Sequence, residues 1–191
     1  MRVAIAAGDG HVRVEERDEP VPGPGEVVVR VALCAISGAG VLALREGRTP
    51  AGAPLGADLA GTVVRAGEQV SGFAPGDRVA TVVTDASAPV SGGLAEYALV
   101  HESAVVAVPA ALSDHAVALT TTAALAWNAV QDSRVRPGDE LAIVGAGALG
   151  LTVLELLRGL RPSALHVIEP GRAVIFMYTL LYYRVLYPVR R

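Results

Sequence analysis

The sequence predicts a mixed β and α/β fold, in which an all-β region is followed by the start of a doubly wound parallel sheet. Two observations predict it. Up to about residue 108, short apolar segments rich in Val alternate with turns that contain Gly and Pro, which is typical of a β-barrel or sandwich. Beyond Pro137 the order becomes strand, glycine turn, apolar helix and strand, which is typical of a βαβ unit.

The strands expected in the first region are short and separated by turns such as the Pro-Gly-Pro-Gly sequence at 22–25. They lie at residues 3–5, 11–14, 27–33, 61–66, 78–83, 95–100 and 104–108. Between Pro109 and Pro137 the apolar spacing becomes helical. Ser113 is the expected N-cap and Asp114 suits the first turn. Leu119, Ala123 and Trp127 follow at intervals of four residues and predict one apolar helix face.

The second region is organised around the sequence GAGALG at 145–150, which has the spacing G-x-G-x-x-G between an expected strand at 140–144 and an expected helix. Because Gly147 has no Cβ, a pyrophosphate can approach the turn, and the following helix points its free N–H groups at the anion. The alternative is an ordinary close-packing turn. The second strand, 164–169, ends in Glu169, at the offset of about 20 residues expected for a carboxylate that binds ribose hydroxyls. The residues predicted to bind a dinucleotide are Gly145, Ala146, Gly147, Ala148, Leu149, Gly150 and Glu169.

Composition excludes several other classes of protein. The chain has 191 residues, 52% of them hydrophobic, so it is long enough to form real cores and is not disordered. All 16 basic residues are arginine, but the net charge is −3 and the basic residues do not cluster before the last residues, so no nucleic-acid partner is expected. With Cys34 as its one cysteine and no apolar leader at the N-terminus, the chain is expected to be cytoplasmic.

The motifs together carry a resemblance to a known family. The segment GTVVRAGEQVSGFAPGDRV at 61–79 resembles the G-x-V-x-x-x-G-x-x-V-x-x-F-x-x-G-D-R-V motif of the medium-chain dehydrogenase/reductases, the alcohol dehydrogenase-like family. GGLAEY at 92–97 and VRPGD at 135–139 are similar to two further motifs of that family. The resemblance implies a GroES-like barrel at 1–110, a connecting helix at 111–135, a partial Rossmann NAD(P)-binding domain at 136–170 and an atypical apolar and basic tail at 171–191. It also implies a structural role for the Gly-Asp-Arg turn and Tyr97.

The same resemblance implies that the catalytic zinc ligands of the family are missing. Ser37 stands where the family has a ligand cysteine, Ala57 where it has the ligand histidine, and Thr121 near the third ligand. Ala39 and Gly40 replace the proton-relay hydroxyl and the aspartate that supports the metal site. No zinc is therefore expected, and the histidines are scattered without ligand spacing: His11, His101, His115 and His166.

Two classes of function remain open. The first is a zinc-independent NAD(P)-dependent oxidoreductase, with NAD preferred over NADP, that transfers hydride to or from a carbonyl, enone or quinone of a small-molecule substrate. The expected barrel face offers Ser37, Ser87, Ser91 and Thr121 as hydroxyl donors. Of these only Ser37 is a candidate carbonyl donor, and the alternative is that it fills the space of a lost cysteine. Trp127 and Tyr97 are expected in the core.

The second class is a non-catalytic chain, either a truncated gene product or a cofactor-binding remnant that acts only through subunit contacts, for instance in a homo-oligomer. The resemblance stops after Pro170, and the tail holds four of the five tyrosines and four arginines but no acidic residue. A frameshift or early stop is the simplest expected origin of this change, and a real structural element is the alternative. A membrane anchor is a minor alternative, because the uncharged run at 173–183 is shorter than the roughly 20 residues of a spanning helix. We expect the chain alone to be inactive.

Overall fold

The computed structural model describes residues 1–82, 90–169 and 185–186. It divides into two compact units, Met1–Thr121 and Thr122–Arg191, each of which is described by itself. Ser87, the Ser91 side chain and most of the tail, including the uncharged run at 173–183, lie outside the described residues. Among the described residues, no helix is long and apolar enough to cross a membrane.

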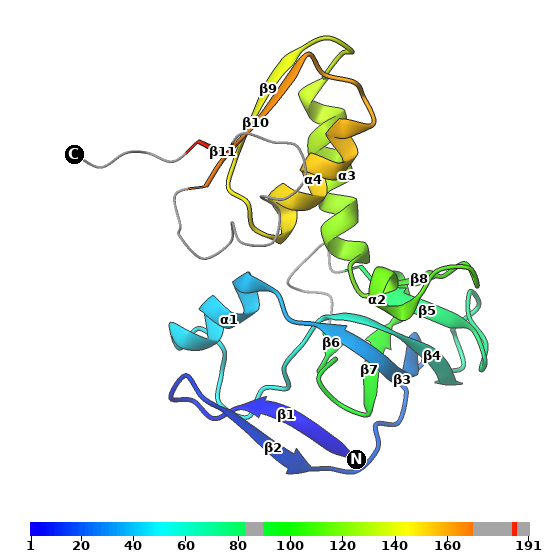
Figure 1. Cartoon of the computed structure of the whole chain (residues 1–191). Helices are drawn as coiled ribbons and strands as arrows, with labels where there is room; N and C mark the ends of the chain where they lie inside the picture. Colours follow the sequence, from blue (N-terminus) through cyan, green and yellow to red (C-terminus); the bar gives the residue numbers. More distant parts are fainter. Residues whose placement is uncertain (83–89, 170–184, 187–191) are drawn as a thin grey trace. The chain divides into compact units, whose positions relative to one another are not determined.

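The first unit is built from antiparallel strands, as the alternating apolar pattern predicts (Figure 1). A six-stranded sheet has the order β6-β7-β3-β4-β5-β8, and β1 and β2 form a separate hairpin. The strands are β1 (Arg2–Ala6), β2 (Val12–Glu16), β3 (Glu26–Ala35), β4 (Asp58–Ala66), β5 (Arg78–Thr81), β6 (Val90–Ser91), β7 (Tyr97–His101) and β8 (Val105–Ala107). Two register shifts interrupt the β3–β4 pairing, and such bulges bend a sheet. The fold is the expected GroES-like one.

The core of this unit consists of inward-facing valines of the long strands, joined by Leu59 from β4. Val27, Val29, Val63, Val79 and Val100 are at most 1% exposed. Burial of a Val side chain contributes roughly 1.5–3 kcal/mol, so this cluster supplies most of the apolar stabilisation of the sheet.

Two elements of the first unit differ from the sequence expectation. The segment Gly38–Arg45 forms the helix α1, which the apolar spacing does not predict because two glycines stand in its first turn. The start of the strand expected at 104–108 belongs to the 3-10 helix η1 (Glu102–Ala104), and only Val105–Ala107 pairs with β5.

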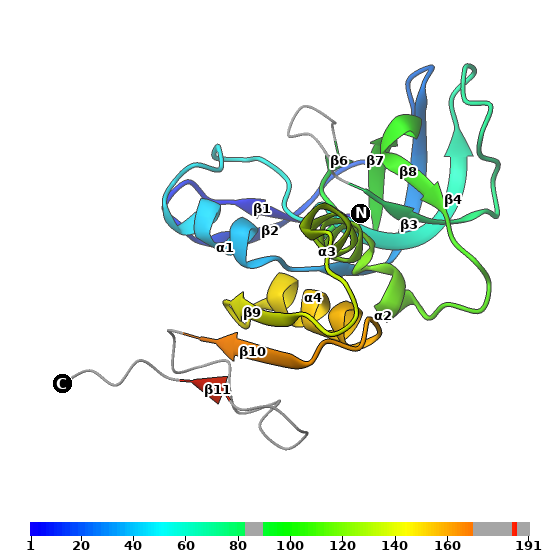
Figure 2. The same ribbon diagram turned by 90° about the horizontal axis from the view of Figure 1, so that it is seen from above.

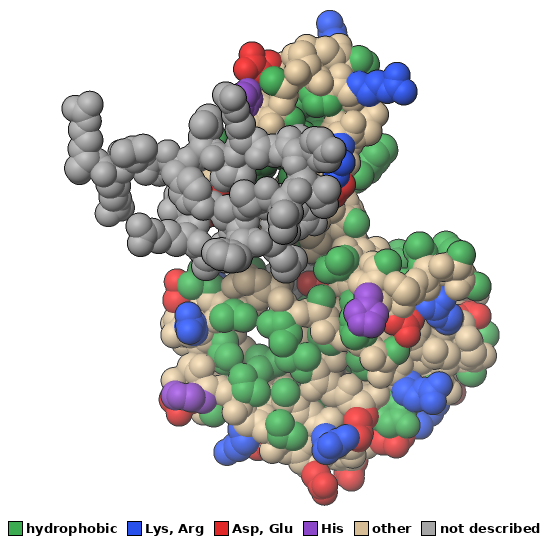
Figure 3. Space-filling view, in the orientation of Figure 1, with side chains coloured by type: hydrophobic (Ala, Val, Ile, Leu, Met, Phe, Trp, Pro, Cys, Tyr) green, Lys and Arg blue, Asp and Glu red, His purple; other side chains and the backbone are tan. Residues whose placement is uncertain are grey.

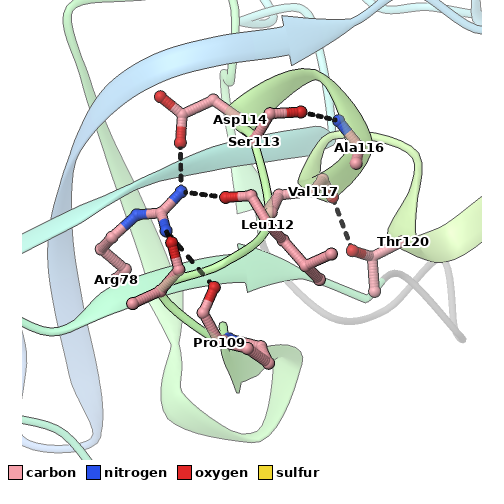
Figure 4. A network of polar contacts seen from close by, with 9 residues as sticks. Arg78, Pro109, Leu112, Ser113, Asp114, Ala116, Val117 and Thr120 are labelled. Atoms are coloured by element: carbon pink, nitrogen blue, oxygen red, sulfur yellow. Dashed lines mark hydrogen bonds and ion pairs between the residues drawn. The ribbon is translucent and has the colours of Figure 1, made fainter.

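The Gly-Asp-Arg turn has the structural role that the resemblance implied. Arg78 donates hydrogen bonds to the carbonyl oxygens of Pro109, Ala110 and Leu112 and to the carboxylate of Asp114 (Figure 4). Asp114 opens the short helix α2 (Asp114–Val117), and Ser113 is its N-cap, as predicted. One guanidinium thereby fixes the path of the chain from the sheet into this helix.

The second unit contains the predicted βαβ arrangement. The elements are β9 (Glu140–Val144), α4 (Ala148–Arg158) and β10 (Ala164–Ile168), with β9 and β10 parallel and in register. The two-residue strand β11 (Val185–Leu186) pairs parallel with β10, so the order is β11-β10-β9 (Figure 2). This is the 3-2-1 order of one half of a doubly wound sheet.

The single helix expected at 111–135 is instead two helices, α2 and α3 (Thr120–Ser133), with Leu119 just before α3, and α3 buries a different face from the predicted one. Ala126 and Val130 are its buried residues, whereas Leu119 and Trp127 are 48% and 53% exposed. The expectation that Trp127 lies in the core is therefore wrong. Spacing alone showed that the apolar residues share a face, but which face is covered depends on packing against other elements.

Candidate functional site

The glycine loop between β9 and α4 uses each of its three glycines for a different reason. Gly145 has φ +103°, a conformation that residues with a Cβ rarely adopt. A Cβ on Gly150 would lie 1.9 Å from the carbonyl oxygen of Gly145, so only glycine lets the helix pack this closely on the loop. Among the residues that the structure describes, none would lie within 4 Å of a Cβ on Gly147. The missing Cβ at Gly147 therefore leaves the backbone open to an approaching molecule and is not needed for packing within the described residues.

The N-terminus of α4 lies at this open position. Gly147 is the N-cap and offers no side-chain acceptor, and the first turn contains no acidic residue. The first N–H groups of a helix have no partner within the helix, and its dipole favours an anion there. The arrangement suits a phosphate, which would satisfy these N–H groups without any basic side chain.

Glu169 is brought to the same loop from the end of β10. Its Oε2 accepts a hydrogen bond from the backbone N of Ala146 at 2.6 Å, and the residue is 8% exposed. The neighbouring N–H of Gly145 donates to the carbonyl oxygen of Ile168 at 2.7 Å. The structure thus brings together the predicted loop at 145–150 and the predicted acidic residue, which are 23 positions apart in the chain at the contact.

In the first unit, the candidate donor Ser37 is the N-cap of α1. Its Oγ accepts a hydrogen bond from the backbone N of Gly40 at 3.1 Å. A serine in this position stabilises a helix by roughly 1 kcal/mol. The contact supports the structural alternative for Ser37, because the hydroxyl oxygen already serves the helix end.

The other two positions where the family has zinc ligands are linked through a residue that the sequence analysis missed. Thr81 is 2% exposed. Its Oγ1 accepts from the backbone N of Leu59 at 2.9 Å and donates to the carbonyl oxygen of Ala57. Thr121 in turn donates its hydroxyl to the carbonyl oxygen of Thr81 at 3.4 Å. The signal in the sequence was a polar residue directly after the apolar Val79 and Ala80 in a strand, because a buried hydroxyl needs partners.

Cys34 is held as a thiol. Burial raises its pKa to about 11, with a smaller contribution from the charge of Asp58. Its Sγ lies near the positions that a Cβ on Gly56 or Gly93 would occupy, at 2.7 and 2.8 Å, so the sulfur fills the space between two glycines. The thiolate is the form of cysteine that binds a metal, and this environment disfavours it.

These observations test whether a catalytic zinc fits. Zinc in proteins is bound by thiolate, imidazole or carboxylate groups. At the three positions in question this chain has a capping hydroxyl, a methyl group and a hydroxyl that donates to a backbone carbonyl. Among the described residues, no group of three or more His, Cys, Asp or Glu side chains could hold a metal ion. The described residues at these three positions do not fit the metal.

An open depression of about 450 Å³ lies elsewhere in the first unit, and β1, β3 and the segment before β7 contribute most of its wall. Cys34, Leu33 and Leu94 belong to its wall, and Arg2 forms an ion pair with Glu96 at 3.1 Å, both also in the wall. Hydrophobic side chains gather on the face that carries β1 and α1 (Figure 3). Neither Ser37 nor Thr121 lines the depression.

Comparisons with known proteins agree with this fold. Residues 23–110 match the alcohol dehydrogenase GroES-like domain. The (R,R)-butanediol dehydrogenase of Bacillus subtilis is 28% identical over 88% of this chain and 58% of its own length. A protein of Mycobacterium tuberculosis named as a probable zinc-binding alcohol dehydrogenase is 32% identical over 92% of this chain and 50% of its own length. The chain thus spans about half the length of these relatives.

Solved structures give the same result. The crystal structure of 2R,3R-butanediol dehydrogenase from Bacillus subtilis superposes with a TM-score of 0.83 at 25% identity, over 100% of this chain and 64% of the other. A dehydrogenase structure from Sinorhizobium meliloti with bound NADP has a TM-score of 0.77 at 25% identity, over 90% and 56%. Motifs, domain and fold agree, and the chain belongs to the medium-chain dehydrogenase/reductases, a family of NAD(P)-dependent, alcohol dehydrogenase-like oxidoreductases.

Proposed function

We propose that this chain binds a nicotinamide dinucleotide through its glycine loop and serves a zinc-independent oxidoreductase that prefers NAD. The observation that carries the proposal is the loop geometry. Gly147 leaves open backbone at the uncapped start of α4, and the Glu169 carboxylate contacts the same loop. The pyrophosphate would lie against the helix N-terminus, and the ribose hydroxyls would donate to Glu169.

The preference for NAD follows from charge. A carboxylate accepts hydrogen bonds from two hydroxyls but repels a 2′-phosphate. Arg172 is close enough in sequence to offset part of this repulsion, but it lies outside the described residues. We therefore propose a preference and not an exclusion, because a similar dehydrogenase structure holds NADP.

Zinc independence is the second part of the proposal, and the replacement of the ligand positions supports it. A bound nicotinamide supplies or accepts a hydride, and hydrogen-bond donors can polarise a carbonyl, enone or quinone oxygen where no metal does so. Ser37 is the candidate donor, since a hydroxyl that accepts from Gly40 still has its own proton to donate.

A non-catalytic cofactor-binding chain is the second candidate, and one observation favours it. Both hydroxyls at the former ligand positions already have structural partners, Ser37 in the cap of α1 and Thr121 at the Thr81 carbonyl. If the helix cap and the Thr81 contact are the whole function of these two hydroxyls, the chain would bind cofactor without transferring hydride.

The test measures binding, metal content and turnover on one preparation. We expect NADH to bind more tightly than NADPH in fluorescence titrations, and binding to be lost in Gly147→Val, whose side chain fills the open approach. Elemental analysis after mild chelator washing should find no stoichiometric zinc, and about one zinc per chain would refute zinc independence. NADH oxidation with a panel of quinones, enones and aldehydes separates the two candidates, with Ser37→Ala as the test of the proposed donor.

A further inference from the structure

The end of β10 holds the glycine loop through two consecutive backbone N–H groups. Ile168 accepts from Gly145 through its carbonyl oxygen, and Glu169 accepts from Ala146 through its carboxylate. Between them these contacts fix the position at which the chain leaves β9 and turns, with Gly145 at φ +103°. The loop is therefore shaped partly by β10, the neighbouring strand, and not only by its own glycines.

The carboxylate contact is the unusual one of the two. A residue that served only to bind ribose would extend into solvent in a chain without cofactor, yet Glu169 is 8% exposed. Removing a carboxylate from water is costly unless it is hydrogen-bonded, and a hydrogen bond from a backbone N–H to a charged oxygen is among the stronger ones. Both the burial and the 2.6 Å distance indicate that Glu169 already has a function before any ligand arrives.

We propose that Glu169 is a positioning residue for the glycine loop as well as the residue that selects the ribose, so that one carboxylate couples loop geometry to cofactor choice. This inference rests on the proposed function. Its consequence concerns specificity: a 2′-phosphate could be accommodated only if the carboxylate moved away, and that movement would release the Ala146 N–H. Removal of the acid should then weaken binding of both cofactors and should not convert the chain to NADP.

The experiment compares three variants of the full chain. Glu169→Ala removes both functions. Glu169→Gln keeps a side-chain oxygen that can accept from Ala146 but removes the charge that discriminates against a phosphate. Glu155→Gln is the matched control, because Glu155 is an exposed residue of the same unit that pairs with Arg158 on α4. Amide hydrogen exchange of Ala146 reports on the loop without cofactor, with amides in the interior of α4 as the reference for global unfolding, and titrations with NADH and NADPH report on binding.

In Glu169→Ala we expect the exchange of Ala146 to accelerate at least about tenfold, the effect of losing a charge-assisted hydrogen bond, while the α4 amides change much less. Both NADH and NADPH should bind at least about tenfold more weakly. In Glu169→Gln the exchange should stay within about threefold of the unmutated chain, and the ratio of the two affinities should approach one. Glu155→Gln should change neither measurement.

The inference is overturned if Ala146 exchanges at the unmutated rate in Glu169→Ala, or if that variant binds NADPH more tightly than the unmutated chain does. A failure of the proposed function has a different result, namely that the unmutated chain binds neither NADH nor NADPH. The exchange of Ala146 would still decide whether Glu169 positions the loop in that case.

Discussion

Substitution of Gly150 by alanine tests whether the glycine loop is held by close packing. The new Cβ would lie 1.9 Å from the Gly145 carbonyl oxygen and 3.5 Å from Ile143, and real Cβ atoms essentially never approach within 3.0 Å. The clash is with backbone, so a rotamer change cannot relieve it, and the loop or the first turn of α4 must move by about 1 Å. Overpacking of this kind costs about 1–3 kcal/mol.

The matched control is Gly147→Ala in the same loop. Its φ is −72° and its Cβ would contact no atom of the described part of the chain, so alanine fits the backbone there and should change stability by at most about 1 kcal/mol, the cost of replacing an N-cap glycine. For a unit of this size, 2 kcal/mol corresponds to a fall in Tm of about 8–16 °C. We therefore expect a clear fall in Tm for Gly150→Ala and a small one for Gly147→Ala, both measured by circular dichroism and by calorimetry.

The two variants should also differ in dinucleotide affinity. Gly147→Ala should remain folded but lose dinucleotide affinity, because its methyl group enters the space left for the pyrophosphate. Ordinary surface substitutions change the free energy of unfolding by at most about 0.5 kcal/mol. If Gly150→Ala changes it by no more than this, the packing argument is refuted.

Three further predictions concern the first unit. Arg78→Met should lower the free energy of unfolding, measured by urea titration, by about 2 kcal/mol, because it removes hydrogen bonds from a charged group. The control Arg65→Met breaks an exposed ion pair and should lower it by less than about 1 kcal/mol. Thr81→Val should cost about 1–3 kcal/mol because it leaves the Leu59 N–H buried without its acceptor, and Thr81→Ser should recover most of the loss. The pKa of Cys34 is raised from 9.0 to about 11 in the folded chain, because the fold favours the neutral thiol. The stability that this preference provides is present below pH 9 and is lost as the pH rises through 11. Stability curves of the unmutated chain and Cys34→Ala should therefore diverge above pH 9, and identical curves would contradict the assignment.

Features encoded within a few residues could be predicted from the sequence. The glycine loop, the N-cap at Ser113 and the strands on either side of α4 all depend on local backbone chemistry, and the structure confirms them. The sequence does not predict the helix α1, because Gly38 and Gly40 stand in its first turn, and Ser37 was expected only as a carbonyl donor or as a filler of space.

Features that depend on packing between distant segments could not be predicted. The buried face of α3 is set by the residues that pack on Val130, and the spacing of Leu119 and Trp127 carried no information about them. The second function inferred for Glu169 is a similar case. Its distance from the loop depends on the register of β10 beside β9, which no local pattern specifies.

The exposed position of Trp127 gives the chain an internal optical reporter. It is the one tryptophan in the sequence, so its fluorescence has a single origin, and at 53% exposure it should emit at the long wavelengths of a solvated indole. Any molecule that covers this face of α3 would displace water from the ring and shift the emission to shorter wavelengths. Association of the second unit with another protein or with a second copy could therefore be followed without a label, in samples that contain no reduced nicotinamide, since NADH absorbs light at the wavelengths where indole emits.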